Sequence, residues 1–308
     1  MRKVGFVYSP VFLKHATPLG HPESRERLIA ITGRLGSAPF WKNIIQISPS
    51  KAEHSDIALV HTDNYISKVM SFGTGHLDPD TYMSEDSLEA ALFAAGAVID
   101  AVRKCKSGEI LRAFCAVRPP GHHAEAYRAM GFCIFNNVAI AARSAQQAGF
   151  KKVFIVDFDV HHGNGTQHIF YEDDTVFYFS THQSPHYPGT GGKAERGQGK
   201  GEGFTYNVPM HHGYGDKEYE SAYCEVLPGL VKEFGPDILL VSAGYDIHAN
   251  DPLAGLRVTD EGIRTIVSCI LSSLPDPEHI PVVFSLEGGY NITALSNGVS
   301  ITMEEMLK

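Results

Sequence analysis

Long apolar runs are missing from this 308-residue chain. No run approaches the roughly 20 residues that a membrane-spanning helix needs. The first eight residues, which begin with a methionine and two basic side chains, form too short an apolar stretch for a secretory signal peptide. We therefore expect an intracellular, cytoplasmic protein that makes no contact with a membrane.

Cysteine is scarce, and its spacing contains no Cys-x-x-Cys pair. The five cysteines are Cys105, Cys115, Cys133, Cys224 and Cys269. An odd number of widely spaced cysteines predicts reduced, separately buried thiols rather than a disulfide framework or a structural zinc knuckle. We do not expect cysteine to be a metal ligand in this chain.

Clusters of lysine and arginine are also missing, and the formal net charge is -9. Phosphate binding needs clustered basic side chains, so this balance excludes a direct nucleic-acid surface. It is compatible with cationic substrates or partners. The hydrophobic fraction of 43% is that of an ordinary globular protein with a sizeable core. The sequence carries no signal for an oligomeric state.

Short apolar runs alternate with longer amphipathic ones, a pattern typical of an α/β fold with a central parallel sheet flanked by helices. The expected strands are 4–8, 113–117, 153–158, 175–180, 238–242 and 282–286, most of them apolar enough to be covered on both faces. The expected helices are 85–106, 136–148, 217–234 and 259–274, with Thr259 as an N-cap and Gly149 and Gly235 as C-terminal stops. Without a repeat or linker, we expect one domain over 1–308, and an ordered loop at 189–203.

Potential metal ligands crowd together directly after the apolar run 153–156. Asp157, Asp159 and His161 alternate along this stretch, and side chains two apart on an extended segment project to the same face. Two carboxylates beside a histidine carry a large desolvation penalty unless a cation compensates them. The pattern therefore predicts a metal site at the end of a strand.

Polar clusters follow four of the expected strands at equivalent positions. They lie at 118–123, 159–161, 243–246 and 287–290. Two adjacent histidines without other polar neighbours are more often a surface pair, and an isolated aspartate after a strand is usually part of a turn. Parallel strands, however, bring their carboxyl ends to one edge of the sheet, where ligand sites form. We expect the four clusters to meet in one crevice.

Together these motifs resemble the signature of the histone deacetylase superfamily. The matching segments are Arg118-Pro119-Pro120-Gly121-His122-His123, Gly131-Phe132-Cys133, Asp157-x-Asp159-x-His161-His162-Gly163-Asn164-Gly165-Thr166-Gln167, Tyr187-Pro188-Gly189-Thr190-Gly191, Ala243-Gly244-Tyr245-Asp246, Asp251-Pro252-Leu253 and Glu287-Gly288-Gly289-Tyr290. The resemblance begins at His21 and covers nearly the whole chain. It implies the arginase/deacetylase fold, a single α/β domain, and a zinc-dependent amidohydrolase.

By this resemblance, Asp159, His161 and Asp246 bind Zn²⁺, with Fe²⁺ as an alternative for the same nitrogen and oxygen ligands. Three protein ligands leave open positions for water and a substrate carbonyl, as a catalytic site requires. The metal then lowers the pKa of its water and polarises the amide.

The resemblance also assigns the catalytic side chains. His122 and His123 form the acid/base pair, with His123 as the main proton carrier, and Tyr290 donates its hydroxyl to the developing oxyanion. Asp157 lies behind His122 and Asn164 behind His123. Class I enzymes have aspartate at this position. In having Asn164, this chain resembles the class II enzymes and their bacterial relatives. A neutral partner should make His123 easier to deprotonate.

Further residues are assigned by resemblance alone. The resemblance implies that a structural K⁺ is bound by Asp157, Asp159, His161, Ser180 and Thr181. Ser180 and Thr181 also fit an ordinary strand end.

For the substrate, Gly131, Phe132 and Tyr187 match the walls of a narrow acyl-lysine tunnel, while an ordinary core position is the alternative for the two aromatics. Asp80 matches a rim aspartate that grips the substrate backbone, with Asp78 as its competitor. Leu253 replaces the gatekeeper carboxylate of polyamine-selective relatives.

Arg27 fits either an internal acetate exit pocket or a helix surface.

Three functions follow from these assignments. The first is a zinc-dependent deacetylase that acts on N-acetyl-lysine side chains in proteins or peptides. The second is a small-molecule amidohydrolase that acts on acetylpolyamines or other short acyl amides. The third is a non-enzymatic acyl-lysine binding protein, which the complete set of catalytic residues disfavours. We expect a stand-alone catalytic domain.

Overall fold

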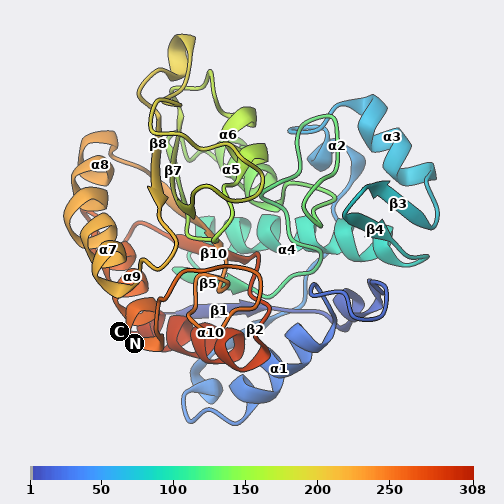
Figure 1. Cartoon of the computed structure of the whole chain (residues 1–308), viewed down its shortest axis with the longest axis horizontal. Helices are drawn as coiled ribbons and strands as arrows, with labels where there is room; N and C mark the ends of the chain where they lie inside the picture. Colours follow the sequence, from blue (N-terminus) through green and yellow to red (C-terminus); the bar gives the residue numbers. More distant parts are fainter. Residues whose placement is uncertain (1–2) are drawn as a thin grey trace.

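The computed structural model describes residues 3–308, and the first two residues of the N-terminal stretch assessed above lie outside this range. Its centre is an eight-stranded sheet with the strand order β2-β1-β5-β10-β9-β6-β7-β8. Every neighbouring pair in this sheet is parallel. A separate antiparallel hairpin, β3-β4, lies apart from it (Figure 1).

The strands of the large sheet are β1 (Val4–Val7), β2 (Ile45–Ile47), β5 (Arg112–Cys115), β6 (Val153–Asp157), β7 (Val176–Gln183), β8 (Thr205–Met210), β9 (Ile238–Ala243) and β10 (Val282–Leu286). The hairpin consists of β3 (Gly75–Asp78) and β4 (Thr81–Met83). The α-helices are α1 (Glu26–Gly36), α2 (His54–Ile57), α3 (Asp63–Ser71), α4 (Ser87–Lys106), α5 (Asn137–Gln147), α6 (Asn164–Ile169), α7 (Asp216–Glu220), α8 (Leu227–Phe234), α9 (Asp260–Ser272) and α10 (Ile292–Leu307). The remaining short helices are η1 (Pro10–Lys14), η2 (Trp41–Asn43), η3 (Gly199–Gly201) and η4 (Ser221–Val226).

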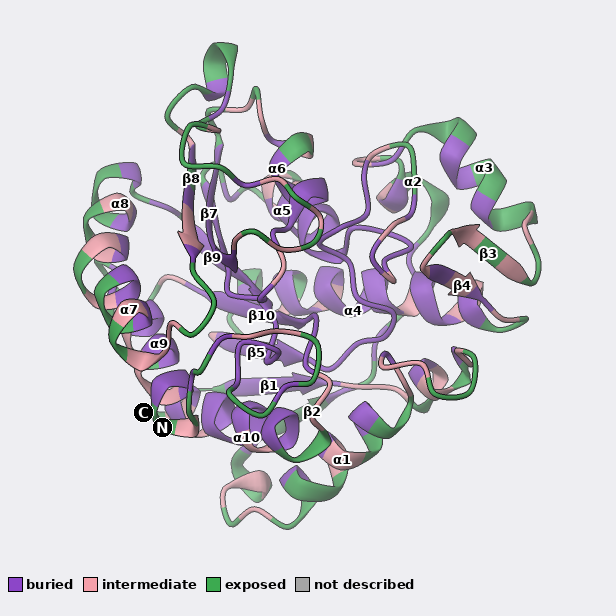
Figure 2. Cartoon of the chain, in the orientation of Figure 1, coloured by how far each residue is buried: buried purple, intermediate pink, exposed green. Residues whose placement is uncertain are grey.

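All six expected strands are present, with ends shifted by a few residues. Each of them is buried along its whole length, because helices cover both faces of the sheet. The helices α4 and α5 pack on one face, and α1, α9 and α10 form the layer on the other (Figure 1). Figure 2 shows the consequence, a buried sheet inside helices that expose only their outer sides. Continuous apolar runs therefore indicate strands correctly in this chain.

The expected helix ends are also largely confirmed. Thr259 caps α9 by accepting a hydrogen bond from the backbone of Gly262, and Gly235 ends α8 in the left-handed conformation, with φ 66°. The single helix expected over 217–234 is instead three segments, α7, η4 and α8, of which η4 is a π-helix. Pro228 lies in the first turn of α8 and lacks the N–H that a continuous helix would use.

The sequence pattern does not predict β2, β8, α1 or α10. The strand β2 has only three residues, and two of them are exposed, so its apolar pattern is weak. The helix α10 is rich in serine, threonine and glycine, which have low helix propensity, but most of its side chains are buried. Tertiary packing rather than propensity stabilises this helix.

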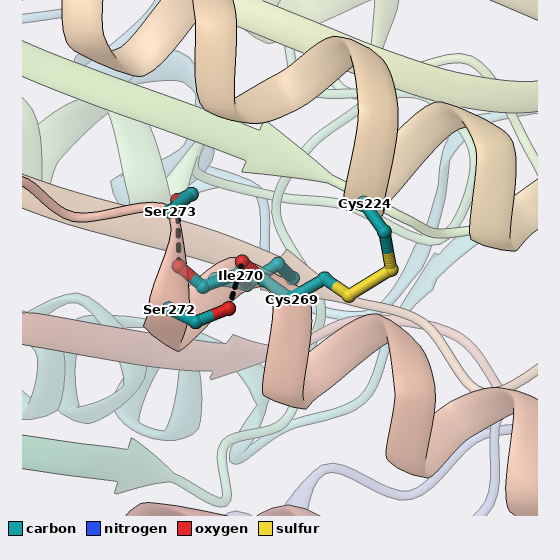
Figure 3. Close-up of a disulfide and its surroundings, with 5 residues drawn as sticks. All are labelled: Cys224, Cys269, Ile270, Ser272 and Ser273. Atoms are coloured by element: carbon teal, nitrogen blue, oxygen red, sulfur yellow. Dashed lines mark hydrogen bonds between the residues drawn. A yellow bond between two sulfur atoms is a disulfide. The ribbon is translucent and has the colours of Figure 1, made fainter.

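The expectation that all five cysteines are separate thiols is wrong for one pair. Cys224 on η4 and Cys269 on α9 form a disulfide, and their Cα atoms lie 5.2 Å apart (Figure 3). The two residues are 45 positions apart in sequence, and only the packing of η4 against α9 brings them together. Cys105, Cys115 and Cys133 are buried free thiols, as expected.

Within residues 3–308, no helix combines the length and the apolar character that crossing a membrane requires.

Candidate metal and catalytic site

The four polar clusters meet at one edge of the sheet. They follow β5, β10, β9 and β6, which are adjacent strands in the middle of the sheet. Because all four strands run parallel, their carboxyl ends deliver the clusters to the same place. The expected crevice is therefore present, and residues more than 160 positions apart in sequence, such as Gly121 and Glu287, are in hydrogen-bond contact there.

The three expected metal ligands lie together. One side-chain ligand atom from each of Asp159, His161 and Asp246 lies within 4.8 Å of the other two. His161 Nδ1 is 3.0 Å from Asp159 Oδ1 and 3.3 Å from Asp246 Oδ2. Both carboxylates are buried, and the histidine is half-buried. One imidazole and two carboxylates form a donor set that divalent zinc or iron accepts.

The carboxylates themselves show that the group fits a cation. Asp246 Oδ2 is buried and, apart from the His161 imidazole 3.3 Å away, has no hydrogen-bond partner among the described residues. Burial and the charge of Asp159 raise the pKa of Asp246 to about 7. A Cβ at Gly288 would overlap Asp246 Oδ2, so a glycine is needed for the chain to pass this close to the carboxylate. Buried carboxylates in such a group are best compensated by a positive ion.

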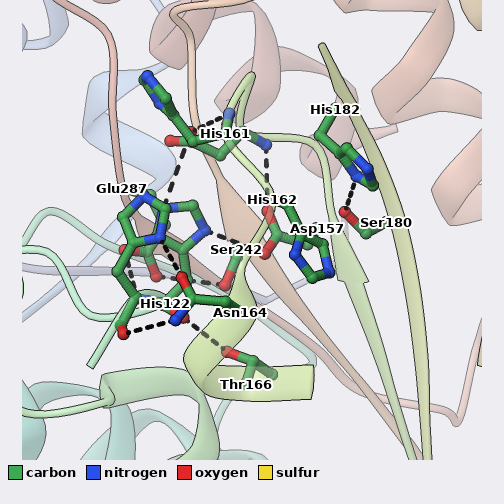
Figure 4. A network of polar contacts seen from close by, with 12 residues as sticks. His122, Asp157, His161, His162, Asn164, Thr166, Ser180, His182, Ser242 and Glu287 are labelled. Atoms are coloured by element: carbon green, nitrogen blue, oxygen red, sulfur yellow. Dashed lines mark hydrogen bonds and ion pairs between the residues drawn. The ribbon is translucent and has the colours of Figure 1, made fainter. Parts of the chain in front are cut away.

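Two histidines follow β5 and line the same cavity. The rings of His122 and His123 have centroids 4.1 Å apart. His122 Nδ1 lies 3.1 Å from Asp157 Oδ2, and His123 Nδ1 lies 2.8 Å from Asn164 Oδ1. Figure 4 shows His122, Asp157 and Asn164 within one continuous polar network. The structure thus brings together each expected pair of histidine and partner.

The surroundings of the two histidines shift their pKa values in opposite directions. Burial opposes protonation of His122, but the charges of Asp157 and Asp159 outweigh it and raise the pKa of His122 to about 10. Burial and the positive charges of His122 and His161 hold the pKa of His123 well below its usual range. The hydrogen bond with Asn164 acts in the opposite direction and raises the pKa of His123, so the effect expected of a neutral partner stays a prediction.

Two carboxylates have positioning contacts that sequence reasoning missed. Glu287 Oε2 accepts hydrogen bonds from the backbone of Gly121 and His122, at 2.7 and 3.1 Å, and holds the histidine loop against β10. Asp251 Oδ2 accepts from the backbone of Tyr290 at 2.7 Å. Both residues lie within the quoted motifs, and for Glu287 the available signal was an acidic residue directly after the buried strand β10.

Tyr290 lies at the cavity beside Arg27. The guanidinium carbon of Arg27 is 5.2 Å from the centroid of the Tyr290 ring. Arg27 is fully buried and donates to the backbone oxygens of Gly289 and Glu287, at 2.8 and 2.5 Å. The helix-surface alternative for Arg27 is therefore wrong, because α1 turns this residue toward the Gly288-Gly289 segment.

The cavity itself is narrow, with a volume of about 180 Å³. All five expected substrate residues line it, namely Asp80, Gly131, Phe132, Tyr187 and Leu253. The other lining residues are Pro120, His122, His123, His161, Gly288 and Tyr290. Tyr187 and Leu253 are partly exposed at 39% and 37%, which excludes the core alternative for Tyr187.

Phe132 adopts a left-handed backbone with φ 68°. The backbone N–H groups of Gly131 and Phe132 donate to the side chains of Asp80 and Thr81, at 2.9 and 3.2 Å. Asp80 therefore supports the cavity wall from the β3-β4 hairpin.

The residues expected at a potassium ion lie on two adjacent strands, β6 and β7, and in the segment that follows β6. Asp157 of β6 and Ser180 of β7 are register partners, and both are buried. The hydroxyl of Ser180 contacts His182 Nδ1 at 2.9 Å, and that of Thr181 contacts Tyr223 at 2.8 Å. Burial beside Asp157 is compatible with the predicted ion, which stays a prediction.

Comparison with known proteins agrees with this architecture. The histone deacetylase domain family matches residues 21–306. Histone deacetylase 5 of Arabidopsis thaliana is 40% identical over 100% of this chain and 49% of its own length. A probable deacetylase of Archaeoglobus fulgidus is 39% identical over 94% of this chain and 81% of its own length. The crystal structure of the HDA15 HD domain superimposes with a TM-score of 0.93 at 36% identity, covering 99% of this chain and 88% of that one.

The fold and the strand-end site define the arginase/deacetylase class of α/β proteins. Within that class, the chain belongs to the histone deacetylase domain family. It spans about half the length of the Arabidopsis relative, so it corresponds to one part of that longer protein.

Proposed function

We propose that this chain is a zinc-dependent deacetylase that removes the acetyl group from N-acetyl-lysine side chains in proteins or peptides. The observation that carries the proposal is the convergence of the Asp159–His161–Asp246 group, the two histidines and Tyr290 around one narrow cavity. Metal ligands, a general base and an oxyanion donor are the parts that amide hydrolysis needs. The family membership supports the same chemistry.

Asp159, His161 and Asp246 would hold the metal, which when bound supplies an activated water and polarises the substrate carbonyl. His123 is uncharged near neutral pH, since its pKa is low, and it accepts the proton of the attacking water. His122, kept cationic by Asp157, stabilises the negative charge that develops beside it.

The hydroxyl of Tyr290 donates to the oxygen of the scissile carbonyl. Asp251 holds the backbone of Tyr290 in place for this contact.

The cavity walls favour an acyl-lysine over an acetylated polyamine. Phe132 and Tyr187 offer apolar surface to the four CH₂ groups of lysine, each worth about 0.8 kcal/mol when buried. Leu253 at the mouth offers no carboxylate for a distant ammonium group. A small acyl amide without a second charge stays the second candidate, because the same cavity accommodates it. We also propose a structural K⁺ beside Asp157 and Ser180.

The test is acetate release from acetyl-lysine peptides and acetylpolyamines by zinc-loaded protein. We expect peptide turnover, and we expect Tyr290→Phe to lower kcat by roughly 100- to 1,000-fold, as loss of an oxyanion donor does. Tyr65→Phe is the matched control, because the Tyr65 hydroxyl bonds the backbone of Ile134 in a separate buried cluster.

Turnover of acetylpolyamines but not of peptides would contradict lysine deacetylation and support the small-molecule amidohydrolase. Peptide binding with no acetate release would contradict an enzymatic role and support an acyl-lysine binding protein. Equal losses in the Tyr290 and Tyr65 variants would contradict the proposed role of Tyr290.

A further inference from the structure

Glu125 is a buried carboxylate two residues after His123, and the mechanism above does not use it. Its relative exposure is 2%. The backbone around it is fixed, because its N–H donates to the carbonyl oxygen of Arg128 at 3.0 Å and its carbonyl oxygen lies 3.0 Å from His61 Nδ1. The backbone of Glu125 is therefore held in one place close to the catalytic histidines.

The side chain of Glu125 contacts two residues of α6. Its Oε1 accepts a hydrogen bond from Asn164 Nδ2 at 2.6 Å and lies 2.8 Å from His168 Nδ1. The hydrogen bond to Glu125 raises the pKa of His168, which makes His168 a donor in this contact. The first turn of α6 packs directly against the histidine loop, since a Cβ at Gly165 would overlap the backbone oxygen of Ala124. The segments that carry Glu125 and Asn164 are consequently packed against each other.

These contacts determine which end of the Asn164 amide faces His123. The three atoms that Asn164 Nδ2 contacts are all acceptors: Glu125 Oε1 at 2.6 Å, the His123 carbonyl oxygen at 3.4 Å and Met130 Sδ at 3.3 Å. The NH₂ end must therefore point toward Glu125. The Oδ1 end then faces His123 Nδ1 at 2.8 Å.

An amide oxygen accepts but cannot donate, so His123 Nδ1 must carry the hydrogen. The second ring nitrogen, Nε2, is on the other side of the imidazole and is left with its lone pair. The ring of His123 lines the cavity, and Nε2 is the atom that a general base uses there. The orientation of one amide thus sets the tautomer of a catalytic histidine.

We infer that Glu125 is a positioning residue: it fixes the orientation of the Asn164 amide and, through it, the Nδ1–H tautomer of His123. A carboxylate at position 164 would present the same acceptor at both ends and would need no such partner. Asn164 has two chemically different ends, and a reversed amide would donate to Nδ1 and place the hydrogen on Nε2. His122 needs no equivalent of Glu125, because its partner Asp157 is a carboxylate.

The importance of this tautomer for turnover rests on the proposed function, but the tautomer itself is measurable without activity. Zinc-loaded protein with ¹⁵N-labelled histidine reports the protonated nitrogen of each ring, and the His123→Asn variant identifies the signal of His123. We expect the Nδ1–H form in the wild type. In Glu125→Ala we expect a mixture with the Nε2–H form, with kcat lower by roughly 10- to 100-fold and KM within about twofold.

The control is Glu305→Ala, which removes an equally buried carboxylate on α10 that pairs with Arg264 and Lys308 far from the cavity. We expect this variant to lose stability without changing the His123 signal. An unchanged His123 tautomer in Glu125→Ala would overturn the inference. Equal losses of kcat in the two variants would also overturn it, because Glu125 would then be a structural residue only.

A rescue experiment tests the pairing directly. Asn164→Asp places two carboxylates face to face, whereas Glu125→Gln combined with Asn164→Asp restores a donor opposite an acceptor. We expect the double variant to recover about tenfold in kcat over Asn164→Asp alone. No recovery would contradict the pairing. If the wild type hydrolyses no acyl amide, the proposed function fails, while the tautomer comparison still decides the role of Glu125.

Discussion

At the scale of single residues, the buried charges behind the proposed active site are the most consequential feature. Glu23 is fully buried and pairs with Arg27 at 3.1 Å and with Arg118, both of them also fully buried. Burial favours the neutral acid, but the charge of Arg118 and the contact with His15 outweigh it and hold the pKa of Glu23 well below its usual range. Glu23 thereby anchors two arginines, one of which supports the Tyr290 segment.

We expect Glu23→Gln to lower the free energy of unfolding at pH 7 by about 3–5 kcal/mol, because it leaves a buried guanidinium uncompensated. A carboxyl with a depressed folded-state pKa stabilises the fold above its unfolded pKa of about 4.3 and loses that contribution as pH falls through the folded value. The difference between variant and wild type should therefore shrink below about pH 4. Urea denaturation of both proteins at several pH values measures this difference in the free energy of unfolding.

The matched control is Glu89→Gln, which breaks the exposed ion pair with Lys14. Its effect should stay below about 1 kcal/mol, because solvent screens the pair. A pH-independent difference for Glu23→Gln would contradict the assignment of the charged form.

At the scale of elements, close approaches that depend on glycine connect the helices to neighbouring segments. Gly96 lies in the middle of α4, and a Cβ at this position would overlap the backbone oxygen of Ser50. Backbone contact of this kind holds the segment before α2 against α4, where Ala52 donates to the backbone of Leu92 at 3.0 Å.

Gly96→Ala should therefore destabilise the protein by about 1–3 kcal/mol through overpacking, although alanine is the better helix former. In α8, Gly229 has no atom within 4 Å of an added Cβ. Gly229→Ala should raise the free energy of unfolding by up to about 1 kcal/mol. Thermal and urea unfolding of both variants would show opposite signs, and a stabilised Gly96 variant would contradict the close contact.

The disulfide is an element-scale constraint between η4 and α9. Replacing both Cys224 and Cys269 with serine should lower the free energy of unfolding by about 2–4 kcal/mol, because the unfolded chain loses a cross-link. A reductant should lower the thermal midpoint of the wild type to a similar extent and leave the double variant unchanged. If reductant has no effect on the wild type, the two thiols are not paired in solution.

At the scale of the whole molecule, metal binding should stabilise the native state, since the Asp159–His161–Asp246 group forms only on folding. Zinc at 100 times its Kd should add about 2.7 kcal/mol to the free energy of unfolding. The metal-free Asp246→Asn variant should be at least as stable as the metal-free wild type, because it removes a buried carboxylate beside Asp159, yet zinc should no longer stabilise it. Calorimetry with zinc, chelator and Mg²⁺ tests this. Equal stabilisation by Mg²⁺ would contradict the ligand set.

The sequence by itself determined the buried strands and the site at their carboxyl ends. Both are local signals: continuous apolar runs mark strands covered on two faces, and each functional cluster directly follows its own strand. The expected metal ligands, histidines and cavity residues consequently lie where the motifs predict.

Only the tertiary structure decided the features that join distant segments. The pairing of Cys224 with Cys269 needs η4 against α9, and the burial of Arg27 needs α1 turned toward the Gly288-Gly289 segment. The contact of Glu125 with Asn164 needs α6 packed on the histidine loop. The weak helix formers of α10 are helical because the neighbouring layer buries them. In each case the free energy comes from long-range contacts, for which a sequence pattern contains no local signal.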